Sequence, residues 1–248
     1  MLGEERHNTI VNLVEQYGSI TVQELMNHVD ASESTLRRDL NILDSEGRLI
    51  KVHGGAMAKT TAYQTTDDDV NIRKSLNIEE KIAIAKYAAG LVSKNDIIFL
   101  DAGTTTELMI DYIMESDVMF VTNAMTHAKK LSQKGFETYV LAGRFKSLTE
   151  SVVGEETIMG LDKYNFTKGF FGTNGVTVKN GFTTPDIKEA LVKKKAIEKT
   201  KEVYILSDSS KFSQISAVTF GKFDEARIIT CKNVDNSFRG YKNVMEVE

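Results

Sequence analysis

Residues 32–55 constrain the fold of this chain more than any other segment. Leu36, Leu40 and Leu43 recur there at helical spacing, so one face of a helix would carry all three leucines. Residues 48–52 then have the pattern of a strand, and a glycine pair after them permits a tight turn. A helix with a polar outer face, followed by a strand and a tight turn, is typical of a DNA recognition helix and its wing. We therefore expect the polar face of this helix to enter a major groove.

Two further helices are predicted before this segment, each with one apolar face. Thr21 and Glu24 have the spacing of a capping box at the start of the second helix, and Ser32 can cap the third. Asp30 and Ala31 then form the tight turn that a helix-turn-helix unit requires between its last two helices. The three helices would share one small core. The two apolar faces consist of Ile10, Leu13, Val14 and Tyr17, and of Val22, Leu25, Met26 and Val29.

The candidate DNA-contacting residues lie on the third helix and in the wing. The net charge of -4 gives no general basic footprint, so the contacts to phosphate would be local. Between Gly47 and Lys59 the chain has basic residues and no acid, which suits a wing against a phosphate backbone. The alternative is an ordinary solvated helix face whose arginines pair with Glu33 or Asp44. The candidates are Ser34, Thr35, Arg37, Arg38, Asn41, Lys51, His53 and Gly54.

A polar segment without periodicity, residues 59–69, separates this part from the rest of the chain. Beyond it, continuously apolar runs alternate with helical patterns, which is typical of parallel strands buried on both faces by helices. The 248 residues are enough for two domains. We predict a winged helix-turn-helix domain over residues 1–57, a linker over 58–76 and an α/β, Rossmann-like parallel-sheet domain over 77–248. The expected strands are 97–100, 118–121, 138–141, 169–171, 203–206 and 227–229, and the expected helices are 79–92, 107–114, 124–134, 155–162 and 187–200.

Composition and spacing disfavour several other classes of protein. The single cysteine, Cys231, cannot form an internal disulfide and ends an apolar run, so we expect a buried strand residue. No apolar run reaches transmembrane length and no basic leader precedes one, so we expect a cytoplasmic protein without a membrane partner. No dinucleotide motif Gly-x-Gly-x-x-Gly is present, and no cofactor is expected. No metal is expected either, because no ligand spacing joins His7, His28, His53 and His127.

The loop that follows the first expected strand, residues 101–106, carries the clearest chemical signal of the second domain. It has one glycine and three threonines where a strand ends and a helix begins. Backbone amides and the positive end of the helix dipole converge at such a point and bind anions, and Gly103 would let a phosphate approach the backbone. A threonine at a helix start is also an ordinary cap, so this loop alone is weak evidence. We expect a phosphate site mainly because of the loops described next.

Further polar loops follow the other strands, and the carboxyl ends of parallel strands meet at one edge of a sheet. Residues 170–176 and 181–186 supply small and hydroxyl-bearing side chains, and nearby lysines can neutralise a phosphate dianion. Within the run Lys193 to Lys195, at most one side chain is expected to point inward. The candidate effector-binding residues are Asp101, Gly103, Thr104, Thr105, Thr106, Thr122, Asn123, Gly143, Lys146, Gly172, Thr173, Asn174, Thr183, Glu189, Lys193, Asp208 and Lys211.

The chain resembles the DeoR family of bacterial sugar-operon regulators over nearly its whole length. The second half resembles the sugar-phosphate-binding domain of that family, which is itself similar to ribose-5-phosphate isomerase and glucosamine-6-phosphate deaminase. One departure is visible, because family members often carry Gly-Gly where this chain has Gly143-Arg144. The motifs that carry the resemblance are Ser34-Thr35-Leu36-Arg37-Arg38-Asp39-Leu40, Glu46-Gly47 and Val52-His53-Gly54-Gly55-Ala56 in the first part, and Asp101-Ala102-Gly103-Thr104-Thr105-Thr106, Val121-Thr122-Asn123, Gly172-Thr173-Asn174-Gly175, Gly181-Phe182-Thr183-Thr184 and Asp208-Ser209-Ser210-Lys211-Phe212 in the second.

The resemblance implies a DNA-binding transcriptional repressor of a sugar-utilisation operon, relieved by a phosphorylated sugar. The segments 100–103 and 181–186 look most like those of regulators of fructose operons, so fructose 1-phosphate is the implied effector, with tagatose 6-phosphate as an alternative. Operator DNA is the implied partner. A single winged helix offers few contacts, so we also expect a homo-oligomer, a dimer or a tetramer.

An enzyme of the isomerase type is the main alternative function. An aldose-ketose isomerase needs a carboxylate base and acidic partners to move a proton between two carbons. The isomerases resembled here carry acids in a loop where this chain has Phe171-Gly172-Thr173-Asn174, and Glu189 is the nearby carboxylate that remains. We therefore expect no catalytic residue, and binding of the sugar phosphate without turnover.

Overall fold

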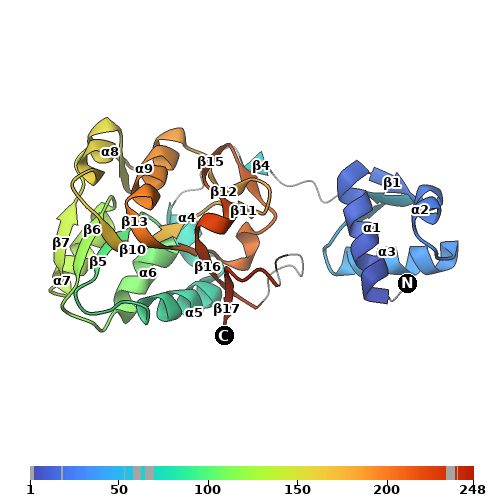
Figure 1. The fold of residues 1–248 in the computed structure, drawn as a ribbon, viewed down its shortest axis with the longest axis horizontal. Coiled ribbons are helices and arrows are strands. Elements are labelled where there is room, and N and C mark those ends of the chain that lie inside the picture. Colours follow the sequence, from blue (N-terminus) through green and yellow to red (C-terminus); the bar gives the residue numbers. More distant parts are fainter. Residues whose placement is uncertain are drawn as a thin grey trace. The chain divides into compact units, whose positions relative to one another are not determined.

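The computed structural model describes residues 3–17, 19–52, 54–57, 63–64, 70–232, 238 and 240–248. The chain divides into two compact units, Met1–Ala62 and Tyr63–Glu248 (Figure 1). The boundary falls inside the segment expected to be a linker, residues 58–76, so the later part of that segment belongs to the second unit. Within the described residues, no helix has the length and apolar character needed to cross a membrane.

The first unit is a three-helix bundle with a small antiparallel sheet. Ser32 caps the third helix by accepting a hydrogen bond from the Thr35 amide, and both halves of the capping box between Thr21 and Glu24 are present, as expected. The sheet has the strand order β1-β3-β2, and β1 was not predicted. The elements are α1 (Gly3–Tyr17), β1 (Ser19–Thr21), α2 (Val22–His28), α3 (Glu33–Ser45), β2 (Ile50–Val52) and β3 (Gly55–Met57).

The core of this unit follows the predicted leucine stripe. Leu36, Leu40 and Leu43 are buried, together with residues of the two preceding apolar faces. Two members of those faces are exceptions, because Tyr17 and Met26 are exposed. The short helix α2 turns other residues inward, and Tyr17 at the last turn of α1 lies against the ring of His28 instead. Gly55 is required for close approach of β3 to β1, since a Cβ atom there would lie 2.2 Å from the carbonyl oxygen of Ile20.

The second unit is built on a seven-stranded sheet in which every neighbouring pair is parallel. The strand order is β17-β16-β13-β10-β5-β6-β7. The first strand along the chain, β5, is therefore an inner strand; β6 and β7 extend the sheet to one edge, and β10, β13, β16 and β17 extend it to the other. The order reverses between β5 and β10, which is where ligands bind in open parallel sheets. The strands are β5 (Ile97–Leu100), β6 (Met119–Thr122), β7 (Glu137–Val140), β10 (Phe166–Gly172), β13 (Thr200–Leu206), β16 (Arg227–Cys231) and β17 (Val244–Val247).

Helices cover both faces of this sheet and confirm the predicted α/β layers. Along β5 the side chains alternate between the two faces: Phe99 belongs to one core cluster, and Ile98 and Leu100 belong to the other. Helices α5 and α6 lie on one side of the sheet, and α8 and α9 lie on the opposite side (Figure 1). The helices are α5 (Ile78–Ala89), α6 (Thr104–Tyr112), α7 (Met125–Gln133), α8 (Glu155–Leu161) and α9 (Ile187–Glu198).

Several elements of this unit differ from the sequence-based expectation. Helix α6 begins at Thr104, earlier than the predicted start at residue 107, because the threonines themselves form its first turn. β17 was not predicted, and β7 is an exposed edge strand rather than a strand buried on both faces. The remaining short elements, also unpredicted, are β4 (Tyr63–Gln64), α4 (Val70–Ser75), β8 (Arg144–Lys146), β9 (Ser151–Val153), β11 (Gly175–Thr177), β12 (Gly181–Thr184), the 3-10 turn η1 (Ser209–Lys211), β14 (Ile215–Ser216), β15 (Val218–Gly221) and η2 (Phe223–Glu225).

Candidate functional site

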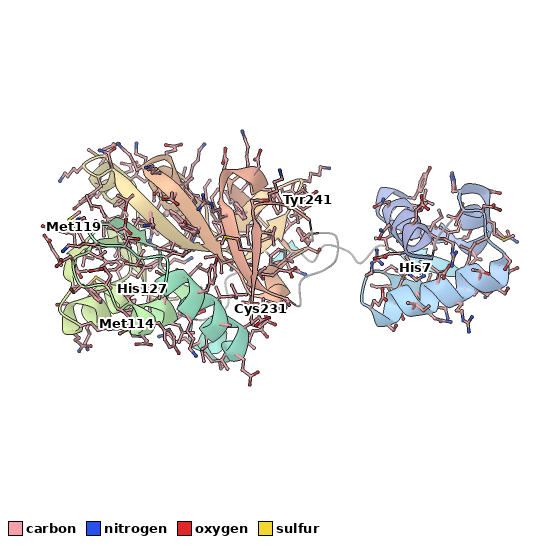
Figure 2. The ribbon with its side chains drawn as sticks, turned by 60° about the horizontal axis from the view of Figure 1, so that its bottom comes forward. His7, Met114, Met119, His127, Cys231 and Tyr241 are labelled. Carbon is pink, nitrogen blue, oxygen red and sulfur yellow. The ribbon has the colours of Figure 1, made fainter. Side chains whose placement is uncertain are left out.

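The recognition helix α3 is fixed to α1 through a buried carboxylate. Asp39 on α3 accepts hydrogen bonds from Arg6 at 2.6 and 3.2 Å, and its Oδ1 lies 2.9 Å from Nε2 of His7. His7 lies on α1 of the first unit (Figure 2). Burial of Asp39 opposes its ionisation, but hydrogen bonds and charge from Arg6 and His7 hold the pKa of the carboxyl below its ordinary value. The contact sets the rotation of α3, so the leucine stripe faces the core and the polar stripe faces outward.

The outward face of α3 carries the predicted DNA-contacting residues. Arg37 donates two hydrogen bonds to Oε1 of Glu33, as the alternative reading of this face anticipated for one arginine. Arg38 is exposed, and among the described residues its guanidinium has no hydrogen-bond or ion-pair partner. Asn41 accepts a hydrogen bond from Nζ of Lys51 on β2, at 2.6 Å. The polar groups of this face are therefore not all free.

The N-terminal turn of α3 and the wing hold the other candidates. The hydroxyl of Ser32 lies 3.0 Å from that of Ser34 and 2.8 Å from that of Thr35, so three hydroxyls are grouped at the helix start. Gly54 has a φ of +86° at the wing turn, in the left-handed region that favours glycine. His53 lies outside the described residues.

In the second unit, a pocket opens at the carboxyl ends of three neighbouring strands, β13, β10 and β5. The start of α6, the end of α4, the start of α5, one face of α9 and the turn η1 complete its wall. The polar loops at the carboxyl ends of the strands were expected to meet at this edge, and the reversal of strand order between β5 and β10 lies at the same place. The lining residues are Arg73, Leu76, Asn77, Lys81, Ala102, Gly103, Thr104, Thr105, Thr149, Gly172, Thr173, Asn174, Glu189, Lys193, Leu206, Asp208 and Lys211.

A buried ion pair lies behind the wall of this pocket, and of its two members only Lys193 lines the pocket. Asp101 follows β5, Lys193 lies on α9, and the ammonium of Lys193 contacts Oδ2 of Asp101. The same ammonium donates to the carbonyl of Gly172 at 3.0 Å, and the Gly172 amide donates to Oδ2 of Asp101 at 3.1 Å. Complete burial raises the pKa of the Asp101 carboxyl, and the charge of Lys193 opposes that rise. The ion pair ties the loop after β5 to the loop after β10 and to α9.

Glu189 is the second buried carboxylate of the pocket. Its Oε1 accepts hydrogen bonds from the hydroxyls of Thr149 at 2.6 Å and Ser151 at 3.2 Å and from Nζ of Lys146 at 3.0 Å. Burial opposes ionisation, but the hydrogen bond from Thr149 and the charges of Lys193 and Lys146 keep the pKa of Glu189 below its ordinary value. A carboxylate that is stabilised in this way is a weak base.

Three cationic side chains meet on the opposite wall of the pocket. Lys81 on α5 is 4% exposed and donates a hydrogen bond to the backbone carbonyl of Arg73 at the end of α4. Burial lowers the pKa of Lys81, the charge of Asp208 opposes this, and the nearby charges of Lys211 and Arg73 lower the pKa further. The buried Nε of Arg73 has no hydrogen-bond partner. In the described part of the chain, none of these three cations forms an ion pair with a carboxylate.

The start of α6 adds uncompensated backbone amides to this wall. Gly103 is the N-cap residue and supplies no side-chain cap, and the first hydrogen bond of the helix runs from the Glu107 amide to the Gly103 carbonyl at 2.9 Å. The amides of the preceding threonines have no intrahelical acceptor. Gly103, Thr104 and Thr105 line the pocket, so the positive end of the helix dipole is directed at it.

Ten of the predicted effector-binding residues line the pocket, and the other seven lie behind or beside it. Thr106 donates to the carbonyls of Asp101 and Gly103 and lies 3.0 Å from Nε2 of His127. His127 lies on α7 (Figure 2), and burial lowers its pKa to about 3. Asn123 accepts from the Ala102 amide at 3.1 Å and thereby holds the same loop. The residues outside the lining are Asp101, Thr106, Thr122, Asn123, Gly143, Lys146 and Thr183.

Sequence reasoning missed Arg73, Asn77 and Lys81, which the structure places in the pocket wall. The segment up to residue 76 was expected to be a linker, and Lys81 was not among the candidate residues. Asn77 has a φ of 50° and donates to Oδ1 of Asp208 at 2.9 Å, which brings the junction of α4 and α5 to η1. An asparagine between two short helical patterns is the one signal that could have indicated this turn.

Comparisons with known proteins match both units to the same family, the DeoR family. The DeoR-like helix-turn-helix domain matches residues 6–62, and the DeoR C terminal sensor domain matches residues 76–232. The chain is 42% identical to the uncharacterized HTH-type transcriptional regulator FruR of Bacillus subtilis (strain 168), over 100% of this chain and 99% of that protein. It is 37% identical to the lactose phosphotransferase system repressor of Streptococcus mutans serotype c, over 95% of each chain.

Two solved structures are more distantly similar. Ribose 5-phosphate isomerase A from Methanocaldococcus jannaschii matches with a TM-score of 0.41 and 18% identity, over 55% of each chain. The probable sor operon regulator from Shigella flexneri matches with a TM-score of 0.45 and 7% identity, over 78% of this chain and 95% of that one.

Proposed function

The chain belongs to the DeoR family of transcriptional regulators, and on that premise we propose that it represses a sugar-utilisation operon until fructose 1-phosphate binds its sensor domain. The family membership supports the coarser statement, a repressor of a sugar operon. The similarity to a regulator named FruR supports the choice of a fructose derivative. We place the protein in the cytoplasm, where its operator DNA and a phosphorylated sugar would both be found.

The observation that carries this proposal is the cationic wall of the pocket. Arg73, Lys81 and Lys211 converge on one side of it without a carboxylate partner among the described residues, and Asp208 is the nearby acid. Lys81 is buried, and Arg73 and Lys211 are half-buried. Withdrawing unpaired cations from water is costly, so such a group fits a site whose anion comes from a ligand. A phosphate dianion has the charge and the acceptor oxygens to pair with these cations, and the uncapped start of α6 supplies further donors.

The remaining polar lining suits the hydroxyl groups of a sugar. Thr149, Thr173 and Asn174 lie in the same pocket as the cationic wall. Hydroxyls and amides of this kind fix the orientation of a small polar ligand. We therefore assign the phosphate to the cationic wall and the sugar hydroxyls to the opposite side, towards α9.

The geometry of Glu189 favours binding over isomerisation. An isomerase base must accept a proton from carbon, whereas Glu189 is held by two hydroxyls and an ammonium that keep its pKa low. The loop after β10 has Thr173 and Asn174 where an isomerase of the resembled type would carry acids. An isomerase-like enzyme is the alternative, and conversion of fructose 6-phosphate or ribose 5-phosphate by the purified chain would support it.

The first unit would bind operator DNA through α3 and the wing. We propose Ser34, Thr35, Arg37, Arg38, Asn41 and Lys51 as its contacts, with His53 and Gly54 at the wing turn. A homo-oligomer, dimer or tetramer, would read paired half-sites.

Fluorescence anisotropy on DNA from the chain's own upstream region tests the proposal. Binding is measured at fixed salt, alone and with fructose 1-phosphate, fructose 6-phosphate or tagatose 6-phosphate, because affinity for DNA depends strongly on salt. Release by fructose 1-phosphate alone is the expected result. If the chain binds the DNA specifically and none of the three sugar phosphates changes its affinity, fructose 1-phosphate is not the effector. If the chain shows no specific DNA binding, the isomerase-like enzyme is favoured instead.

A further inference from the structure

The contact between Lys51 and Asn41 fixes the orientation of an amide on the recognition helix. Lys51 on β2 donates its ammonium to the side-chain oxygen of Asn41 on α3, at 2.6 Å. A lysine ammonium can only donate hydrogen bonds, so the atom that faces it must be the amide oxygen. Among the described residues, Nδ2 of Asn41 has no hydrogen-bond partner. The amide therefore has donors available for a ligand, while its oxygen already accepts one hydrogen bond from an ammonium.

The main chain of Lys51 is held in place on two sides, by the side chain of Asp44 and by β3. Its amide donates to Oδ1 of Asp44 on α3 at 2.9 Å, which attaches the start of the wing to the helix. In the antiparallel pair of β2 and β3, Lys51 lies opposite Ala56. The origin of the lysine side chain is thus fixed relative to α3, and the ammonium lies beside Asn41 as a consequence of how the wing packs.

The side chains of Asn41 and Arg38 offer hydrogen-bond donors on the exposed face of the helix. Asn41 and Arg38 are both exposed and lie three positions apart, on one face of α3. Arg37 is engaged with Glu33, so Arg38 is the arginine of this pair whose guanidinium is available. Donors are therefore available from Arg38, Asn41 and Lys51. The one acceptor among these three side chains is the oxygen of Asn41, which already accepts from Lys51.

Such a surface of donors can distinguish between the edges that adenine and guanine present in the major groove. Asparagine alone pairs with adenine, where it accepts from N6 and donates to N7. An ammonium beside the asparagine oxygen opposes a second donor there, so it disfavours the adenine amino group. Guanine instead offers two acceptors, O6 and N7, which can take one hydrogen bond from Lys51 and one from Asn41.

We propose that Lys51 is a specificity-determining residue that sets the base preference of Asn41, so that the pair reads guanine at an operator base pair where asparagine alone would read adenine. The inference rests on the proposed function, because it requires sequence-specific DNA binding. It adds to that function a residue of the wing that determines sequence rather than only contacting phosphate.

The experiment uses the full chain and a duplex library with randomised sequence. The duplex selected by the unaltered chain is prepared in all single-base-pair variants, and their affinities are measured for the unaltered chain and for Lys51→Met and Lys51→Arg. Arg48→Met is the control for lost positive charge, because Arg48 contacts Asn8 and Glu46 rather than Asn41. Circular dichroism checks that each variant folds.

At one base pair, we expect the unaltered chain to prefer guanine over adenine by about tenfold, within the range of a paired base contact. Lys51→Met should abolish or reverse that preference and leave the preferences at other base pairs unchanged. Lys51→Arg should retain it, since arginine also only donates. Arg48→Met should weaken binding to all the duplexes by a similar factor.

A uniform loss of affinity in Lys51→Met, with every base preference retained, would overturn the inference and leave Lys51 as a phosphate contact. The proposed function would survive that result, because the unaltered chain would still have selected a sequence. If the unaltered chain selects no sequence, the proposed function fails and the inference fails with it.

Discussion

Replacing Lys211 with methionine tests the cationic wall of the pocket most directly. Methionine retains the length and most of the apolar stem of lysine but removes the ammonium. Lys211 lines the pocket and forms no ion pair with a carboxylate among the described residues, so its charge is available for the ligand. We expect the affinity for fructose 1-phosphate to fall while the fold is retained.

The size of the effect follows from the strength of a charge-assisted hydrogen bond. Such a bond contributes about 1.5 to 3 kcal/mol, and the lower half of that range applies because Lys211 is only half-buried. A loss of about 1.5 to 2 kcal/mol corresponds to a dissociation constant about 10 to 30 times larger, since about 1.4 kcal/mol is tenfold.

Isothermal titration calorimetry of the full chain with fructose 1-phosphate measures this directly. Lys194→Met is the matched control, because Lys194 is exposed on α9 and does not line the pocket. Its affinity should equal that of the unaltered chain. A change of less than about twofold in Lys211→Met would refute the assignment of the phosphate to this wall, since the bond that it removes is expected to be worth more.

Three other predictions concern the two sites. Arg38→Ala should weaken operator binding in anisotropy and leave the calorimetric affinity for fructose 1-phosphate unchanged; a variant whose first unit fails to fold would instead indicate a structural role. Thr105→Glu should abolish release of the operator by the sugar phosphate, because it puts a negative charge in the first turn of α6 at the pocket, and an intact response would move the phosphate elsewhere. Lys193→Met should destabilise the second unit by about 3 to 5 kcal/mol in urea unfolding, because it leaves Asp101 buried without its counter-ion. Because burial raises the pKa of Asp101 in the folded state, that loss should be smaller at low pH and grow as the pH rises through the folded-state pKa; a loss that does not change with pH would contradict it.

The first unit could be predicted largely from sequence because its determinants are local. The leucine stripe of α3 and the caps at Thr21 and Ser32 depend on residues within one or two turns of each other, and the structure confirms them. The strand β1 was missed because it is short and pairs with β3, far along the chain. Tyr17 was placed in the core by periodicity alone, which does not indicate where a bundle ends.

The second unit shows where local patterns cease to determine structure. The order of its apolar strands gave the correct fold class and the edge at which the pocket lies. The ion pair of Asp101 and Lys193 joins residues that are 92 positions apart, so no local pattern predicts that both are buried. Arg73 and Lys81 were missed because α4 has only six residues, and because a buried lysine has the same sequence pattern as an exposed one.

Repression relieved by a sugar phosphate requires the pocket and the operator-binding surface to be coupled, and such coupling is reciprocal. If fructose 1-phosphate lowers operator affinity about 100-fold, the coupling free energy is about 2.7 kcal/mol, and operator DNA must weaken sugar-phosphate binding by the same factor. Calorimetric titration of fructose 1-phosphate into the full chain, free and saturated with operator, measures both affinities. We expect binding to the operator complex to be about 100-fold weaker. Equal affinities would show that the two sites are not coupled.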